Sequence, residues 1–288
     1  MINKLKRFFY FPIAYYFRFF AQIQLIFWKP RIIVITGSNA KTTLLNLIES
    51  QIGDRAKYSH HANSSFGIPF DILGLNRMTL TLNEWPRIFL LAPFKAFKIP
   101  PKESLYIVEA DCDRPYEGKF LSTLLKPEVT LWISSGKTHC MNFKEPIEEN
   151  IAFEFGYFLE NTEELVIINR DSSLIKKQLP RIKAKVIKVS KQEHLQKYII
   201  NKDFTEFKID GRIYKFNCLL PEESFYQIMS TLKLIEYFNF PLDASFAKFK
   251  LPPGRSSIFK GIKNTTLIDS SYNANLSSMK VILNMFNK

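Results

Sequence analysis

A chain of 288 residues, 46% of them hydrophobic, can bury the core of one large α/β domain or of two average domains. Its formal net charge of +13 favours acidic partners such as nucleotides, sugar nucleotides, anionic lipids or nucleic acids. The lysines are spread along the sequence and no RNA-binding motif or zinc-finger spacing is present, so we expect no nucleic-acid partner. Three widely spaced cysteines argue against a disulfide framework and indicate a reducing, cytoplasmic location.

The first predicted element is an aromatic helix over residues 1–29, ahead of a domain at 30–288. Residues 8–28 approach the length of a membrane span, and basic residues precede them. Four residues weaken a clean span: Pro12, which we expect to break the first turn, Arg18, Gln22 and Gln24. No small-residue cleavage site follows, which argues against a cleaved signal peptide. Two interpretations remain: an amphipathic helix at the inner face of the membrane, or a helix that packs on the domain or on a partner.

Residues 31–43, RIIVITGSNAKTT, run from a β-branched strand through a glycine into an apolar-periodic helix. This is the order of a phosphate-binding loop, in which backbone N–H groups at the helix N-terminus point at an anion. Lys41 would supply a point charge, and the Thr42 hydroxyl could ligate Mg²⁺. The generic pattern G-x-x-x-x-G-K-[ST] has glycine where Ile35 and Ala40 stand, so that pattern alone leaves an ordinary strand-to-helix turn equally open.

Strands and helices alternate from residue 60 to residue 190. Residues 60–75 are typical of a loop that feeds a helix or a strand, and residues 145–160 have helical spacing. Four buried strands are expected at 104–111, 127–135, 164–171 and 185–190. The alternation predicts an α/β fold with a mostly parallel, P-loop NTPase-like sheet and helices on both faces. Acidic residues at strand ends, such as Glu109, suit metal binding.

The pattern changes after residue 200. Two alternating runs over 205–217 flank Asp210-Gly211, the strongest short hairpin signal, and predict an antiparallel insertion or edge. Four further elements are expected in chain order: a helix at 222–237, a rigid loop at 251–255, a last strand at 265–269 and a helix from 277 onward.

Several spaced segments together resemble the Mur ligase family, the ATP-dependent amide-bond-forming enzymes of peptidoglycan synthesis. TGSNAKTT at 36–43 resembles the family's TG[TS]NGKTT loop, which also lacks the first glycine of the generic pattern, so only Ala40 departs from it. The other matching segments are NSSFGIP (63–69), YIVEAD (106–111), GKTHCMNF (136–143), INRD (168–171), PPGR (252–255) and LIDSSYNANLSSM (267–279). The last two resemble the dipeptide-adding branch most specifically, and the resemblance covers about residues 30–285.

The resemblance implies that ATP phosphorylates a carboxylate of a UDP-muramyl-peptide-type substrate, and that an amino acid or dipeptide amine attacks the acyl phosphate. It implies ATP and Mg²⁺ as cofactors. The implied catalytic residues are Lys41, Glu109 and His139, the metal ligands are Thr42, Glu109 and His139, and the substrate-binding residues are Asn63 and Ser64. The implied nucleotide-binding residues are Gly37, Ser38, Asn39, Ala40, Lys41, Thr42, Thr43, Asn169, Arg255, Asp269, Tyr272, Asn273 and Asn275.

Departures from the family pattern bear on catalysis. Alignment of residues 151–158 with the helix that presents the family's carbamylated lysine places Phe155 at that position, so we expect a second metal to be held poorly, with His139 as its only protein anchor. His60 and His61 are rival imidazoles. If the backbone φ of Ala40 is negative, alanine costs little there and a change to glycine leaves nucleotide affinity unaltered.

Two functions stay open. The first is an ATP-dependent Mur-type ligase that is truncated or split, because the family's UDP-binding domain and its C-terminal ligase domain are expected to be absent from residues 1–288. A partner chain would then supply the missing domains. The second is a non-catalytic nucleotide-binding subunit or scaffold of a cell-wall precursor complex, which docks through its N-terminal helix. Phe155 and the expected absence of the two domains favour the second function, and the ordered motifs favour the first.

Overall fold

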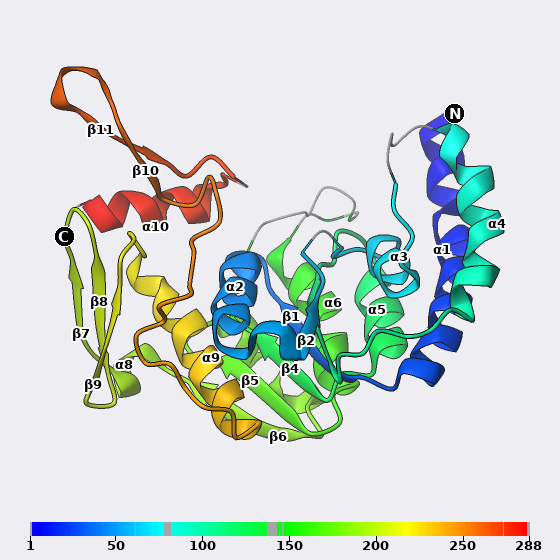
Figure 1. Cartoon of the computed structure of the whole chain (residues 1–288), viewed down its shortest axis with the longest axis horizontal. Coiled ribbons are helices and arrows are strands. Elements are labelled where there is room, and N and C mark those ends of the chain that lie inside the picture. The colour runs from blue at the N-terminus through cyan, green and yellow to red at the C-terminus, as the bar shows by residue number, and fades with distance from the viewer. Residues whose placement is uncertain are drawn as a thin grey trace.

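The computed structural model describes residues 2–60, 62–77, 82–136, 143, 145, 147–272 and 274–286. Its centre is a six-stranded sheet with the order β2-β3-β1-β4-β5-β6 (Figure 1), and every neighbouring pair is parallel. The strands are β1 (Arg31–Thr36), β2 (Ala56–Tyr58), β3 (Leu105–Ala110), β4 (Val129–Trp132), β5 (Leu165–Asn169) and β6 (Lys185–Val189). The predicted parallel α/β fold is confirmed.

Both faces of the sheet are buried, and successive side chains of a strand point to opposite faces, so each strand contributes to both cores. In β1, Ile32 and Val34 join one hydrophobic core, and Ile33 and Ile35 join the other. All four side chains are at most 6% exposed. This explains why the strand is a continuous apolar run instead of an alternating one.

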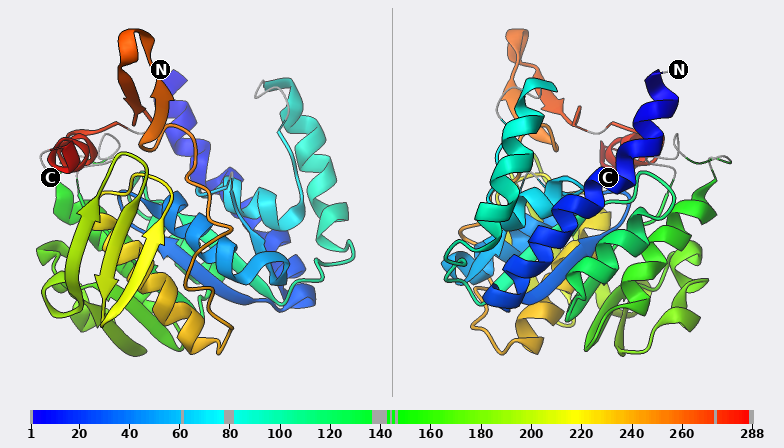
Figure 2. Two further views of the ribbon diagram at one scale, coloured as in Figure 1. Left: turned by 60° about the vertical axis from the view of Figure 1, so that its left-hand side comes forward. Right: turned by 90° about the vertical axis from the view of Figure 1, so that its right-hand side faces the viewer.

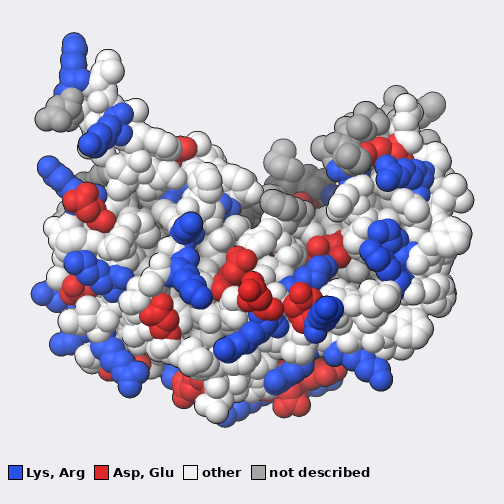
Figure 3. Space-filling model, viewed as in Figure 1, with Lys and Arg blue, Asp and Glu red and all other residues white. Residues whose placement is uncertain are grey.

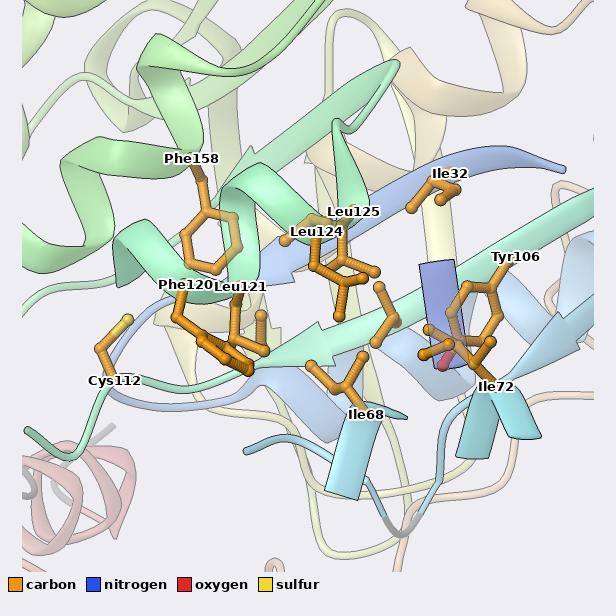
Figure 4. Packing of buried hydrophobic residues seen from close by; sticks show 14 of the residues in the cluster. Ile32, Ile68, Ile72, Tyr106, Cys112, Phe120, Leu121, Leu124, Leu125 and Phe158 are labelled. Atoms are coloured by element: carbon orange, nitrogen blue, oxygen red, sulfur yellow. The ribbon is translucent and has the colours of Figure 1, made fainter. Parts of the chain in front are cut away.

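Helices cover both faces, as the sequence predicts (Figures 1 and 2). One core is covered by α1 (Ile2–Trp28), α3 (Gly67–Leu73), α4 (Trp85–Ala96), α5 (Glu117–Leu125), α6 (Glu148–Glu160) and α7 (Ser173–Lys176). Figure 4 shows this core, where Phe120 and Leu121 of α5 lie between Phe158 of α6 and Ile68 of α3. The other core is covered by α2 (Lys41–Ile52) and α9 (Phe225–Tyr237).

The N-terminal helix α1 packs on the domain. Ala14, Phe17 and Ala21 are fully buried against the first core, and the indole N–H of Trp28 donates to the carbonyl of Glu103 at 2.8 Å. The helix runs through Pro12, so the expected break there is wrong; the proline is accommodated inside one continuous helix. None of the described helices combines the length and hydrophobicity that crossing a membrane requires.

The hairpin predicted at Asp210-Gly211 is confirmed. Both residues have positive φ, 48° and 81°, as a tight turn between β8 (Thr205–Ile209) and β9 (Arg212–Phe216) requires. With β7 (Leu195–Ile200), which pairs with β8, these strands form a separate antiparallel sheet of order β7-β8-β9 that follows the short helix α8 (Lys191–His194). The hairpin is therefore not an edge of the main sheet, and its inner side chains cover the second core.

The C-terminal part forms a ribbon and a helix. The predicted strand at 265–269 is β11 (Thr266–Asp269), which pairs with β10 (Ser257–Lys260) in a two-stranded antiparallel ribbon. The ribbon projects from the body of the molecule (Figure 2), and α10 (Leu276–Phe286) follows it. The segment between α9 and β10 leads the chain from the end of α9 to the ribbon (Figure 1).

Candidate functional site

The loop after β1 is held in place by the end of β4. The Ser38 N–H donates to the carbonyl of Ser134 at 3.2 Å, and the Ser134 hydroxyl exchanges two hydrogen bonds of 2.8 Å with the backbone of Asn39. Gly37 has φ 133°, and a Cβ there would lie 2.7 Å from the Ser134 carbonyl oxygen. Only glycine fits this position. Sequence analysis missed Ser134, because its role arises from the pairing of β1 with β4.

Ala40 is the strained residue of the loop. It has φ 63° and ψ 14°, the left-handed conformation, immediately before α2. Its carbonyl oxygen accepts a hydrogen bond from the Leu44 N–H at 3.1 Å. The expectation that alanine costs little here depended on a negative φ, and the φ is positive. A glycine would occupy this conformation without the steric cost that alanine incurs.

The Lys41 side chain is buried at the start of α2 and paired with an acid. Its Nζ lies 2.9 Å from Asp111 Oδ2 and donates to the carbonyl of Gly37 at 2.6 Å. The side chains of Lys41 and Asp111 are 8% and 9% exposed. Sequence analysis did not name Asp111 as a site residue, although its place two residues after Glu109, at the end of the same strand, is a usable signal.

Of the two carboxylate oxygens of Glu109 on β3, one accepts a hydrogen bond from a described residue and the other does not. The Thr42 hydroxyl donates to Oε2 at 3.1 Å, whereas the buried Oε1 has no hydrogen-bond partner among the described residues. Burial raises the pKa of the Glu109 carboxyl, against the lowering effects of Lys41 and the Thr42 hydrogen bond. An unsatisfied buried oxygen beside a hydroxyl is suited to a hard cation.

These groups lie on one cavity of about 590 Å³ at the carboxyl ends of the strands. Eleven predicted site residues line it: Ser38, Asn39, Ala40, Lys41, Thr42, Thr43, Asn63, Glu109, Asn169, Arg255 and Tyr272. The predicted His139 and Asn273 lie outside the described residues, as does the rival His61. Segments that carry the predicted motifs and lie far apart in the sequence therefore line one cavity.

Four predicted residues are not among the described residues that line the cavity: Gly37, Ser64, Asp269 and Asn275. The Gly37 carbonyl binds Lys41, and the Ser64 hydroxyl accepts from the Gly67 N–H at 3.1 Å at the start of α3. Asn275 donates to the Asn39 side chain at 2.9 Å and so ties the start of α10 to the loop. Asp269 accepts from the Ser271 N–H at 2.9 Å and lies on the ribbon.

Other lining residues of the cavity bring aromatic, amide and guanidinium groups. The Arg255 guanidinium lies 4.0 Å from the centre of the Tyr272 ring. Asn169 is oriented by a 3.1 Å bond from its Nδ2 to the Ile133 carbonyl. Tyr226, which sequence analysis missed, lines the cavity and donates to Asp171 at 2.6 Å.

Phe155 is part of the first core. It is 1% exposed, and its ring packs against Trp132 with 5.8 Å between ring centres. It is not among the described residues that line the cavity. Glu154 also points away, because its carboxylate accepts the N–H groups of Tyr116 and Gly118 at 2.8 and 2.9 Å. Among the described residues, no cluster of three His, Cys, Asp or Glu side chains forms a metal site by itself.

The parallel sheet, together with the loop that joins β1 to α2, defines an α/β domain of the phosphate-binding-loop class. The family model for the Mur ligase middle domain matches residues 35–233, and the chain therefore belongs to the Mur ligase family. The resemblance of its motifs to that family is confirmed.

Known proteins resemble this chain in sequence and in structure over most of its length. A curated UDP-N-acetylmuramoyl-tripeptide–D-alanyl-D-alanine ligase from Buchnera aphidicola subsp. Acyrthosiphon pisum is 24% identical over 268 residues, which cover 87% of this chain and 53% of that protein. The solved MurF ligase from Thermotoga maritima, in complex with ADP, has a TM-score of 0.75 at 17% identity over 94% of this chain and 60% of that one. MurF from Acinetobacter baumannii has a TM-score of 0.72 at 14% identity over 92% of this chain and 56% of that one.

The structural likeness, at these low identities, establishes the fold. The chain spans about half the length of the curated relatives it matches.

Proposed function

We propose that this chain is the ATP-binding part of a Mur-type ligase, which activates a carboxylate as an acyl phosphate and joins it to an amine. One observation carries the proposal: a loop lysine, Lys41, and the open carboxylate oxygen of Glu109 lie at the same cavity beside a helix N-terminus. Family membership supports it, since the matched relatives are named as ligases. The ADP complex of the Thermotoga maritima protein supports a nucleotide as the ligand.

The loop is assigned to the phosphates of ATP. Backbone N–H groups at the start of α2 attract anions, and Lys41 brings a positive charge that is already oriented by Asp111. Arg255 is assigned to the phosphates, and Asn169 to the adenine. The remaining nucleotide contacts that we propose are Gly37, Ser38, Asn39, Ala40, Thr42, Thr43, Asp269, Tyr272, Asn273 and Asn275.

Glu109 and Thr42 fit Mg²⁺. Both offer oxygen atoms, and Glu109 Oε1 lies buried without a donor among the described residues. Mg²⁺ in proteins is commonly bound by one or two side chains, with the rest of its shell from phosphates and water, so a cluster of three acids is not required. Such an ion would neutralise charge on the phosphates during transfer. His139 is proposed as an anchor of a second ion.

The substrates follow from the names of the relatives. We assign a UDP-muramyl-peptide-type substrate to the side of the cavity formed by Asn63 and Ser64, and an amino acid or dipeptide as the amine. Asn63 is held near the acids because its carbonyl accepts the Asp111 N–H at 2.8 Å. A cytoplasmic location, a partner chain with further ligase domains, and a docking role for residues 8–28 belong to this proposal.

In the reaction, an anionic carboxylate must approach the anionic γ-phosphate. Lys41 lowers the repulsion between the two anions, and the fixed loop amides orient the phosphate without reorganisation. The carboxylate oxygen forms a bond to phosphorus, and the bond to ADP breaks. The amine nitrogen then attacks the acyl carbon, and phosphate leaves.

Isothermal calorimetry tests the first part of the proposal. We expect ATP to bind the purified chain more tightly with Mg²⁺ than with EDTA. No heat of binding in either buffer would refute the nucleotide site. ADP release is then measured with a UDP-muramyl-peptide and D-alanyl-D-alanine, together and separately.

Phe155 favours a second candidate, a non-catalytic nucleotide-binding subunit, because the position aligned to the bridging lysine lies in the core. We expect the 288-residue chain alone to bind ATP and release ADP slowly. ADP release that depends on both substrates, with or without a chain supplying further domains, supports the ligase. ATP binding without such turnover in either setting supports the subunit.

A further inference from the structure

Helices α1 and α4 together form one end of the molecule (Figures 1 and 2). The Tyr16 hydroxyl donates to the carbonyl of Phe89 at 2.8 Å, and the rings of Phe17 and Phe89 lie 5.0 Å apart. These contacts bury the inner face of each helix, including Phe17 and Ala92, which are fully buried. The outer faces contact no other described element of the domain that would cover them.

The outer faces carry large apolar side chains. Leu90, Phe94 and Phe97 recur at helical spacing, and Phe94 is 76% exposed. Ile99, just beyond α4, is 88% exposed. The rings of Phe27 and Phe97 lie 6.2 Å apart, so the exposed side chains of the two helices meet. We call this surface the α1–α4 face; its members are Phe19, Ile26, Phe27, Leu90, Phe94, Phe97 and Ile99.

The charge around this face is mostly positive, although Glu84 directly precedes α4 and Glu103 follows Lys102. Residues 2–30 contain five basic and no acidic residues, and residues 85–102 contain four basic and no acidic residues. Lys29, Lys98 and Lys102 are exposed near its apolar side chains. The face shown in Figure 3, in contrast, intersperses Lys and Arg with Asp and Glu over much of the body. An apolar surface with an excess of positive charge is complementary to a bilayer, whose interior is apolar and whose headgroups can be negative.

We propose that the α1–α4 face docks on the surface of an anionic lipid bilayer. Aromatic and aliphatic side chains enter the boundary between headgroups and acyl chains, and lysines extend to the phosphate level. The absence of a spanning helix among the described residues agrees with a helix pair lying on the membrane. A symmetric dimer through this face is disfavoured, since it would bring two sets of positive charges together. The docking does not depend on the ligase chemistry.

Vesicle flotation tests the proposal with the full chain. We expect the protein to float with vesicles of phosphatidylcholine and 30% phosphatidylglycerol, and not with phosphatidylcholine alone. Binding should fall in 0.5 M NaCl, because the salt screens the lysines. Absence of flotation with anionic vesicles overturns the proposal, and so does equal flotation with both compositions.

Two double variants locate the surface. Phe94→Ser/Phe97→Ser should lower the partition coefficient at least about tenfold, because two largely exposed rings no longer enter the bilayer. Ile262→Ser/Leu267→Ser removes comparable apolar side chains from the β10–β11 ribbon, 83% and 57% exposed, and should leave binding unchanged. Far-UV circular dichroism checks that both variants are folded.

Three outcomes of the variant experiment overturn the proposal. Unchanged binding by the Phe94/Phe97 variant refutes the assignment of the face, as does an equal loss in the ribbon variant. A self-associating parent that becomes monomeric in the Phe94/Phe97 variant, without vesicle binding, assigns the face to a second copy of the chain.

Discussion

Replacement of Ala40 by glycine tests the geometry of the phosphate-binding-type loop directly. Ala40 has φ 63° and ψ 14°, a conformation that glycine adopts freely and alanine does not. The residue is exposed, and its side chain ends at Cβ, so the change removes little packing. Backbone strain is therefore the main quantity that the substitution alters in the folded state.

The magnitude follows from two opposing effects. The left-handed conformation costs an alanine about 1–2 kcal/mol in the folded state. Glycine loses about 0.5–1 kcal/mol more conformational entropy than alanine on folding. Ala40→Gly should therefore stabilise the chain by a net of about 0.5–1 kcal/mol and raise its Tm by about 1–3 °C.

Urea and thermal unfolding, followed by circular dichroism, measure this change. Ala244→Gly is the matched control, because Ala244 is also exposed and its φ is not positive. The control should lose about 0.5–1 kcal/mol, so the two variants should differ in sign. Equal destabilisation of both variants would show that the loop does not hold Ala40 in the left-handed conformation.

Three further variants probe the same cavity. Lys41→Ala should raise the Kd for ATP roughly 10- to 150-fold by calorimetry, as expected for lost hydrogen bonds from a charged group, and an unchanged Kd contradicts its role. Glu109→Gln should abolish the Mg²⁺ dependence of ATP binding. It should also raise the Tm of the ligand-free chain at neutral pH. A carboxyl whose pKa is raised in the folded state lowers the stability of the fold once the pH exceeds its pKa in the unfolded state. In the parent protein, the gain in ATP affinity that Mg²⁺ provides should increase with pH as Glu109 ionises. A gain that calorimetry finds independent of pH would contradict the role of Glu109 as a metal ligand. Gly37→Ala should destabilise the chain by at least about 2 kcal/mol in urea unfolding, because its Cβ would meet the Ser134 carbonyl at 2.7 Å, and wild-type stability would be inconsistent with that contact.

The parallel sheet was predictable because its strands are short apolar runs between turn residues. β1 and β3 each bury all or nearly all of their side chains, and such strands occur where both faces of a sheet are covered. The separate antiparallel sheet was only partly predictable. The turn at Asp210-Gly211 identifies β8 and β9, whereas β7 has a mixed, half-exposed pattern that carries no strong signal.

Helix α4 was not predictable from pattern because it contains two prolines. Pro86 lies in the first turn, where its missing N–H costs nothing, and Pro93 lies inside the helix. The position of α1 was equally open, since an aromatic helix suits a membrane or a protein core. Its packing depends on Phe89 and Trp85 of α4, which the sequence does not place beside it.

The motif residues of the site were predictable, and their supporting contacts were not. Lys41 and Glu109 belong to spaced motifs whose strands pair, so their proximity follows from the sheet order. The ion pair of Lys41 with Asp111 and the bonds of Ser134 to the loop depend on how strand ends align in space. The backbone angle at Ala40 is likewise set by the fold, since alanine favours negative φ when unconstrained.

Three departures from ordinary packing rules meet at one cavity: a left-handed alanine, a buried ion pair, and a carboxylate oxygen without a donor among the described residues. Each costs the ligand-free protein stability. Positive φ and unpartnered buried polar atoms also occur elsewhere among the described residues, but at this cavity they lie beside a buried ion pair. Polar groups that are arranged to bind a charged ligand lack some of their hydrogen-bond or ionic partners until the ligand binds. Mg²⁺ with ATP would supply the partner that Glu109 Oε1 lacks among the described residues. Glu109→Gln should therefore stabilise the ligand-free chain and lower its affinity for Mg²⁺ with ATP.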